Sequence, residues 1–312
     1  MSETIITPGP SCVTDAGLET DLIFHHGVDL PQFAAFPLLE SEAGRALLRT
    51  YYAAFADIAA RHDARLLLES PTWRANPDWG AKLGYAAADL ARINTEAMAF
   101  LRAQATAYDL IGEVVLVGTI GPRGDGYRSD GAVDPVVAQR HHAAQVEALA
   151  GGGADVVTAY TLIEVGEAIG IVRAARAADV PVAIGFTLEV DGRLPGGLDL
   201  REAIARVDDA AAPDYYLINC AHPAHILAGL EQGDAAWRER VHGVRVNASE
   251  LSHAELDESE ENDEGDPDAL ARGVTEVLAA FSGLRILGGC CGTDARHVAA
   301  MWDRARGAAQ PG

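Results

Sequence analysis

The stretch "ADVVTAYTLIEVGEAIGIVRAARAADVPVAIGFT", residues 154–187, contains the structural unit from which the fold can be predicted. Two short apolar runs, 154–161 and 180–187, are rich in β-branched residues, and they flank a longer segment, 164–178, with helical spacing of apolar residues. This alternation is typical of two parallel strands joined by a helix. We therefore predict a β-α-β unit here and ask how far the pattern extends.

The alternation extends along the chain, and we count eight strand-helix units. Start signals support several of the helices, because Asp134-Pro135 and Asp266-Pro267 each place a capping carboxylate before a first-turn proline. Thr293 and Asp294 provide similar groups before the last helix. The predicted strands are residues 11–15, 64–70, 113–120, 154–161, 180–187, 214–220, 241–247 and 284–289. The predicted helices lie near 41–62, 86–107, 135–152, 164–178, 199–211, 222–231, 267–282 and 293–306.

Eight parallel strands with intervening helices, over 312 residues, predict an α/β protein with a (β/α)8 TIM barrel. We expect one domain spanning residues 1–312, with an acidic loop segment near 250–268. The alternative is an open doubly wound sheet. No GxGxxG motif follows the first strand, where "TDAGLETD" (14–21) has a different spacing, so the closed barrel is favoured.

Composition excludes several classes of protein. The formal charge of −22 argues against a nucleic-acid partner, because phosphate binding requires a basic surface. No apolar run approaches the roughly 18 residues of a membrane span, and the first residues lack the pattern of a secretory signal. We expect a soluble, cytoplasmic protein that does not bind membranes. An oligomer is compatible with the sequence.

The four cysteines are too few for a disulfide framework. The adjacent pair, Cys290 and Cys291, can bridge only through a strained ring. The sequence therefore predicts free thiols or metal ligands. Cys12 falls inside the first predicted strand and is expected to be a small buried apolar residue.

Barrel active sites gather at the carboxyl ends of the strands, so these positions are the candidate site. Cys220 ends the sixth strand, and Cys290 with Cys291 follows the eighth, which places three of the four cysteines at one face. Because these strands are near neighbours around a barrel, their thiolates can converge on one metal ion. The other strand-end residues are Asp15, Glu69, Ser70, Thr72, Gly118 to Gly121, Tyr160, Thr161, Thr187, Glu189, Asn219 and Asn247.

Zinc is the metal that best suits three thiolates, and its catalytic sites keep one further position open. Three thiolates donate so much charge that the metal generates hydroxide poorly, but it still deprotonates an incoming thiol. A free thiol has a pKa of about 8.5, and the thiolate is the nucleophile. The pattern therefore favours alkylation of a thiol over hydrolysis, with Cys220, Cys290 and Cys291 as the predicted metal and catalytic residues.

The motifs "GGCCGT" (288–293) and "NCAHP" (219–223) resemble those of the zinc-dependent homocysteine S-methyltransferase family. The segments "DAGLET" (15–20), "ESPTWRAN" (69–76) and "GTIGPRGD" (118–125) are also similar to that family. The resemblance implies a barrel in which the three cysteines bind Zn²⁺ and the homocysteine sulfur takes the fourth position. A cationic donor such as S-methylmethionine, S-adenosylmethionine or betaine then methylates that sulfur, giving methionine. No motif separates these donors.

The resemblance also implies a substrate pocket around Asp15 and Asn219. Many relatives have a glutamate at the end of strand four that holds the amino group of the substrate, whereas this chain has Tyr160, followed by Thr161. Either another carboxylate replaces it or the acceptor is a different small thiol or selenol. The candidate carboxylates are Glu69, Asp15 and Glu189, and the predicted substrate-binding residues are Asp15, Glu69, Thr72, Tyr160, Thr161 and Asn219.

Two other functions are compatible with these residues. The first is a barrel that binds zinc or a thiol without catalysis, which the Tyr160 departure suggests. The second is a redox role for the adjacent cysteines, which their geometry disfavours. Glu69 has a structural alternative too, as the partner of an arginine.

Several aromatic and histidine residues have both functional and structural interpretations. Aromatic rings near the predicted strand ends can face a cationic donor, although loop aromatics are more often packing groups. These rings are Trp73, Trp79, Tyr127 and Tyr160. Among the histidines, two pairs are expected at the surface, and a third pair is the best competing set of metal ligands. The pairs expected at the surface are His25-His26 and His141-His142, and the competing metal ligands are His222 and His225.

Overall fold

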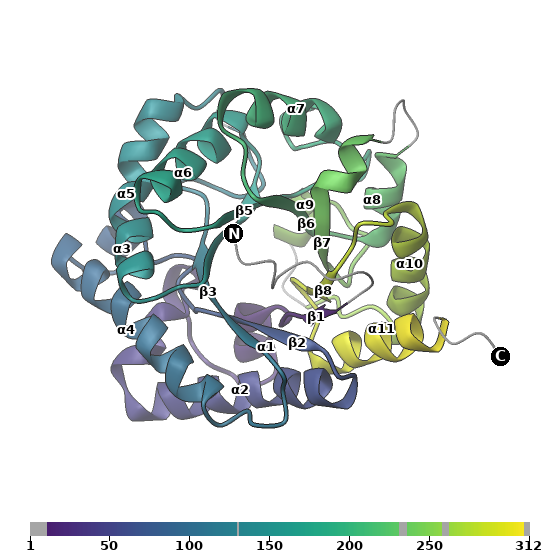
Figure 1. The fold of residues 1–312 in the computed structure, drawn as a ribbon, viewed down its shortest axis with the longest axis horizontal. Coiled ribbons are helices and arrows are strands. Elements are labelled where there is room, and N and C mark those ends of the chain that lie inside the picture. Colours follow the sequence, from purple (N-terminus) through teal and green to yellow (C-terminus); the bar gives the residue numbers. More distant parts are fainter. Residues whose placement is uncertain (1–10, 130, 231–235, 258–261, 309–312) are drawn as a thin grey trace.

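The computed structural model describes residues 11–129, 131–230, 236–257 and 262–308. Its strands form a closed parallel barrel in sequential order, β1 to β8, in which β1 also pairs with β8. In Figure 1 the helices form a ring outside these strands. The strands are β1 (Cys12–Val13), β2 (Arg65–Glu69), β3 (Val114–Ile120), β4 (Val156–Leu162), β5 (Val182–Phe186), β6 (Tyr215–Ala221), β7 (Val241–Val246) and β8 (Ile286–Gly289).

The eight predicted strands are confirmed, and a helix follows each of them at its predicted place. The helices that complete the barrel are α2 (Glu42–Arg61), α4 (Ala87–Ala105), α5 (Pro135–Gly151), α6 (Val165–Ala177), α7 (Leu200–Ala211), α8 (Pro223–Ala228), α10 (Pro267–Ala280) and α11 (Ala295–Ala308). Shorter elements that the sequence pattern did not predict are α1 (Leu18–Phe24), η2 (Pro31–Phe33), η3 (Phe36–Glu40), α3 (Pro77–Lys82), η4 (Ala236–Arg240) and α9 (His253–Asp257).

Helix capping follows the predicted chemistry with one exception. The Asp134 carboxylate accepts hydrogen bonds from the backbone N–H groups of Val136 and Val137 at the start of α5. At α11 the cap is Asp294, which accepts from the Arg296 backbone N–H, while the Thr293 hydroxyl donates to the carbonyl of Cys290. The prediction that Thr293 caps this helix was therefore wrong, because its hydroxyl braces the loop that carries the cysteines. The predicted helix 222–231 ends at Ala228, and residue 231 lies outside the described residues.

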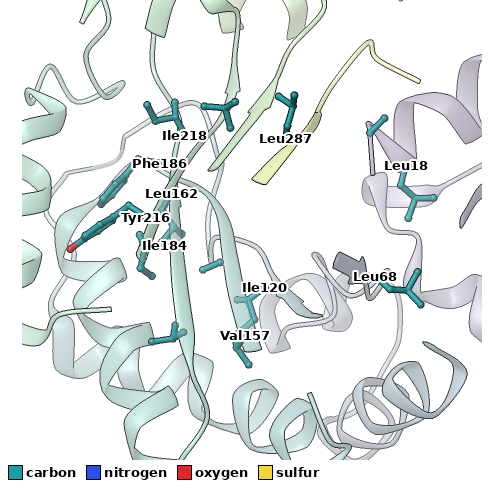
Figure 2. Close-up of a cluster of buried hydrophobic side chains, with 14 of the residues drawn as sticks. Leu18, Leu68, Ile120, Val157, Leu162, Ile184, Phe186, Tyr216, Ile218 and Leu287 are labelled. Atoms are coloured by element: carbon teal, nitrogen blue, oxygen red, sulfur yellow. The ribbon is translucent and has the colours of Figure 1, made fainter. Parts of the chain in front are cut away.

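Strand residues alternate between the barrel interior and the surrounding helices, as the period of two requires. Leu67, Val115 and Val117 belong to the interior cluster. Leu66, Leu68 and other outward residues pack against the helices. Figure 2 shows part of this outer layer, including Leu68, Ile120, Val157, Ile184, Ile218 and Leu287. Inward positions near the carboxyl end of the barrel carry polar groups instead, and these form the site.

Within the described residues, no helix combines the length and apolar character needed to cross a membrane.

Candidate active site

Three cysteine sulfurs meet at the carboxyl ends of β6 and β8. Cys220 is the penultimate residue of β6, and Cys290 and Cys291 directly follow β8. The three Sγ atoms all lie within 4.8 Å of one another. Cys220 and Cys290 are joined by a disulfide, with Cα atoms 5.4 Å apart. The disulfide contradicts the free-thiol alternative for Cys220 and Cys290, whereas the clustering of the three sulfurs supports the metal-ligand alternative.

The backbone around the cysteines adopts conformations that ordinary strands avoid. Cys220 has a φ of +50°, and the β6–β7 register shifts between Asn219 and Ala221. Thr161 has a φ of +61° beside a similar shift in β4. Strain of this kind is typical of functional sites, and an irregular register redirects side chains at the rim of a barrel. Both irregularities lie at the cysteine cluster.

Two glycines allow the loops to approach the cysteines closely. Gly292 has a φ of +75°, which favours glycine directly after the cysteine pair. At Gly17, a Cβ atom would lie 2.6 Å from the carbonyl oxygen of Cys290. The "DAGLET" and "GGCCGT" segments therefore pack against each other through glycine.

The donor set fits a thiophilic metal. Zn–S bonds of about 2.3 Å in a tetrahedral site place neighbouring sulfurs about 3.8 Å apart, so sulfurs within 4.8 Å of one another need only a small adjustment once the disulfide is reduced. No nitrogen or oxygen ligand completes this group among the described residues, which leaves room for a fourth ligand from outside. The soft three-thiolate set suits zinc among the common divalent metals.

Side chains from β4, from the loop after β3 and from α9 contact the cysteines. Thr161 donates its hydroxyl to Cys220 Sγ at 3.7 Å, and Tyr127 Oη lies 3.6 Å from Cys291 Sγ. His253 Nε2 lies 2.8 Å from the Cys220 carbonyl oxygen, and its ring stacks on Tyr127 at 4.2 Å between centroids. Burial raises the pKa of the Cys291 thiol, while the hydrogen bond from Tyr127 opposes that rise. Cys220 is buried, whereas Cys290 and Cys291 are partly exposed, and all three line the cavity.

A buried guanidinium organises the polar layer beneath the cysteines. Arg245 of β7 donates its Nη1–H to Glu69 Oε2 at 2.5 Å and hydrogen bonds to Asp15 through Nη2. It also donates to the carbonyls of Ala16 and Gly289, each at 2.9 Å. Its side chain is only 9% exposed. A charge in this position requires such partners, because an unpaired buried charge costs several kcal/mol.

Glu69 is fully engaged inside the protein. In addition to its ion pair with Arg245, Glu69 accepts hydrogen bonds through Oε1 from the hydroxyl groups of Thr14, at 2.5 Å, and Tyr160, at 2.7 Å. The structural interpretation of Glu69, as the partner of an arginine, is therefore confirmed. Asp15 shares the same guanidinium, and burial raises its pKa well above the ordinary value against the attraction of Arg245.

The predicted substrate-binding residues mostly surround one cavity of about 390 Å³, which the three cysteines also line. Asn219 accepts the Thr161 backbone N–H and donates to the Thr161 hydroxyl, both at 2.9 Å, so it also fixes the bulge in β4. Thr72 is fully buried, donates to the Thr119 carbonyl and lies outside the cavity wall. The predicted residues that line the cavity are Asp15, Glu69, Tyr160, Thr161 and Asn219.

The aromatic rings considered for a cationic donor already face groups of the protein. The Arg74 guanidinium lies 4.1 Å from the Trp73 ring centroid and 3.7 Å from that of Trp79. Arg245 lies 4.7 Å from the Tyr160 centroid, and Tyr127 stacks on His253. These rings therefore serve mainly to hold the arginines and His253 in place.

The histidine expectations have mixed outcomes. His25 and His26 are exposed, as predicted. The prediction for His142 was wrong, since it is fully buried and its Nε2 lies 2.8 Å from Glu167. Its helix packs this face against α6, which the sequence period did not reveal. His222 caps α8 and His225 bonds the Glu250 carbonyl at 3.0 Å, so neither belongs to the cysteine cluster.

The acidic segment near 250–268 contributes directly to the site, although residues 258–261 lie outside the described residues. His253 in this segment is 5% exposed and pairs its Nδ1 with Glu189 at 2.8 Å. Glu189 is therefore occupied too. The sequence reasoning missed four residues here: Glu19, Arg74, Arg245 and His253. For Arg245 a signal was present, because the period of two in β7 places it inside the barrel.

The fold and the site together define a (β/α)8 barrel enzyme with a cysteine cluster where its strands end. The chain belongs to the Homocysteine S-methyltransferase family, which matches residues 12–305. It is thus a methyltransferase-family enzyme, and the resemblance noted from the motifs is confirmed.

Solved structures of the homocysteine methyltransferase MmuM from Escherichia coli share the fold. The oxidised form has a TM-score of 0.73 at 22% identity, with 95% of this chain and 96% of that chain covered. The metallated form has a TM-score of 0.71 at 22% identity, with 97% of each chain covered. The apo form has a TM-score of 0.66 at 21% identity, again with 97% of each chain covered. No curated protein sequence matches this chain significantly.

Proposed function

We propose that this protein is a zinc-dependent S-methyltransferase that moves a methyl group from a cationic donor to the sulfur of homocysteine, giving methionine. The observation that carries the proposal is the convergence of Cys220, Cys290 and Cys291 in one cavity of a family barrel. Reduced, these residues would hold the zinc ion. When bound, the ion supplies a Lewis acid that keeps an incoming thiol deprotonated and nucleophilic.

The chain's own residues shape the reaction around that sulfur. Tyr127 and Thr161 contact the cysteine sulfurs and fix their directions. The cavity wall brings thiol and donor together, and alignment of this kind replaces a bimolecular encounter. The new S–C bond forms as the bond from the methyl carbon to the donor's sulfur or nitrogen breaks, and that atom leaves with the electron pair. The thiol proton would pass to solvent when the acceptor binds as its thiolate, and the demethylated donor group leaves without its positive charge. The transfer step itself therefore needs no general base.

Around the sulfurs, Asp15, Tyr160, Thr161 and Asn219 form the wall against which the acceptor would lie. The Thr119 hydroxyl also lines this wall, and it is buried with no hydrogen-bond partner among the described residues. S-methylmethionine, S-adenosylmethionine and betaine are the candidate donors. Another small thiol or selenol is the alternative acceptor.

The proposal is tested with reduced protein whose bound zinc has been quantified. The enzyme is incubated with homocysteine and each donor in turn, and methionine is measured by mass spectrometry. We expect one zinc ion per chain and turnover with at least one donor. Cys290→Ala and Cys291→Ala should lose both, whereas Cys12→Ala, in β1 and outside the cavity wall, should keep both. Full turnover by a zinc-free Cys291→Ala variant would overturn the proposal.

A further inference from the structure

The carboxylates of the cavity differ in one respect that bears on substrate choice. Asp15 and Glu69 share Arg245, and Asp125 accepts the Tyr127 backbone N–H at 2.7 Å. Asp263 accepts the Ser249 hydroxyl at 2.5 Å. Each of these groups already has a donor within the protein. Glu19 is the cavity carboxylate that none of the described side chains pairs with.

Glu19 lies in the first turn of α1 and lines the same cavity as the cysteines. No hydrogen bond or ion pair within 4 Å joins its carboxylate to another side chain in the described part of the chain. Burial raises its pKa to about 6, so the group is ionised at neutral pH although it is poorly solvated. A ligand ammonium group beside it would compensate this lost solvation, since charge-assisted hydrogen bonds are strong in partly dry sites.

Arg74 supplies the opposite charge on the same cavity wall. Its guanidinium is held over Trp73 and Trp79, and its Nη1–H donates to the Gly124 carbonyl at 3.3 Å. Its Nε is buried without a hydrogen-bond partner among the described residues. A guanidinium fixed in this way retains donors for a carboxylate, which arginine binds in a planar, often bidentate manner.

Glu19 and Arg74 are close enough for each charge to stabilise the other, because Arg74 lowers the pKa of Glu19 and Glu19 raises that of Arg74. They form no ion pair within 4 Å in the described structure. The two charges therefore face one cavity without satisfying each other. This arrangement complements a small zwitterion, whose ammonium and carboxylate groups sit on one carbon.

We infer that Glu19 binds the α-ammonium group and Arg74 the α-carboxylate group of the thiol acceptor, so that the acceptor is a free α-amino acid. The inference rests on the proposed function. Glu19 thus provides the carboxylate that Tyr160 cannot, and Glu69 and Glu189 are excluded because Arg245 and His253 occupy them. Betaine offers no N–H group to a carboxylate. S-methylmethionine and S-adenosylmethionine carry an α-ammonium and an α-carboxylate of their own, so the experiment below also measures the KM for the donor.

The test crosses two variants with two truncated acceptors. 4-Mercaptobutanoic acid is homocysteine without its amino group, and 3-aminopropane-1-thiol is homocysteine without its carboxylate. For wild type, Glu19→Gln and Arg74→Gln, kcat/KM is measured for all three thiols at a saturating concentration of the active donor. Glu96→Gln, which removes an exposed carboxylate on α4, is the matched control.

We expect wild type to prefer homocysteine to either truncated thiol by about ten- to a hundredfold, the usual effect of losing a charge-assisted hydrogen bond. Glu19→Gln should remove only the preference over 4-mercaptobutanoic acid, and Arg74→Gln only the preference over 3-aminopropane-1-thiol. Zinc content should stay at one per chain in both. Glu96→Gln should keep both preferences.

The outcomes separate the inference from the proposed function. If wild type methylates none of the three thiols with any donor, the proposed function fails. If wild type is active but both variants keep its preferences, the assignment of Glu19 and Arg74 is wrong. A rise in the KM for the donor alone, with acceptor preferences unchanged, would also overturn the assignment, because it would place the donor against these charges.

Discussion

The buried guanidinium of Arg245 holds together the polar groups that lie below the cysteines. It connects the end of β1, through Asp15 and Ala16, to Glu69 on β2 and Gly289 on β8. One positive charge thus serves two carboxylates. The group is nearly inaccessible to solvent, so none of these partners can be replaced by water without rearranging the barrel end.

Arg245→Met tests this role at the level of one residue. The substitution keeps much of the side-chain volume but leaves Asp15 and Glu69 buried without their cation. We expect the free energy of unfolding to fall by about 3–5 kcal/mol, as measured by urea denaturation. Arg206→Gln is the control, because Arg206 pairs with Glu202 on the surface of α7 and should change stability by less than about 1 kcal/mol. Equal stability of Arg245→Met and wild type would show that the ion cluster is not structural.

At the scale of elements, two short helices bring distant parts of the chain to the site. α9 positions His253 between Glu189 and the Cys220 carbonyl. α1 ends at Phe24, and the next residue, His25, contacts Glu264 at 2.6 Å and Asp21 at 2.9 Å. Glu264 belongs to the acidic segment after β7. The contact therefore joins two segments that both border the cavity.

This contact should make stability depend on pH. The hydrogen bonds that His25 donates, to Glu264 first and then to Asp21, raise the pKa of His25, and the same bond to Glu264 lowers the pKa of that carboxyl. The contribution of His25 is full below its unfolded pKa of about 6.5 and is lost as pH rises through the folded pKa. That of Glu264 is present above about pH 4.3 and is lost as pH falls through its lowered folded pKa. The contact therefore stabilises most between about pH 5 and 6.

His25→Gln is expected to lower Tm by about 1–3 °C near pH 5.5 and by less at pH 8.5, since exposed pairs contribute under about 1 kcal/mol. Thermal unfolding across this range measures the effect, which should weaken in high salt. His242→Gln is the control, because burial lowers the pKa of His242 and its loss should not destabilise selectively at acidic pH. A Tm difference for His25→Gln that grows toward pH 8.5 would contradict the assigned sign.

At the scale of the whole molecule, the alternation of apolar runs and helical segments predicted the barrel. It also predicted the position of the cysteines, because each strand and its end can be recognised within a short segment of sequence. Tertiary pairing was not encoded in that way. The engagement of Glu69 and Glu189, the burial of His142 and the Cys220–Cys290 disulfide each depend on residues more than 20 positions apart. α1 and α9, at seven and five residues, are too short for a periodic signal.

The metal should also hold the barrel together, because Cys220 and the Cys290-Cys291 pair come from strands separated by β7. A ligand that binds only the folded state stabilises it by about 4 kcal/mol at a thousandfold excess over Kd. Removing zinc from the reduced protein with a chelator is therefore expected to lower Tm by several degrees. Cys12→Ala should show the same zinc-dependent change, and Cys291→Ala should show little. An unchanged Tm after stoichiometric zinc has been removed from reduced wild type would mean that the ion does not link these strands. The loss of a ligand that binds only the folded state must lower the stability of that state.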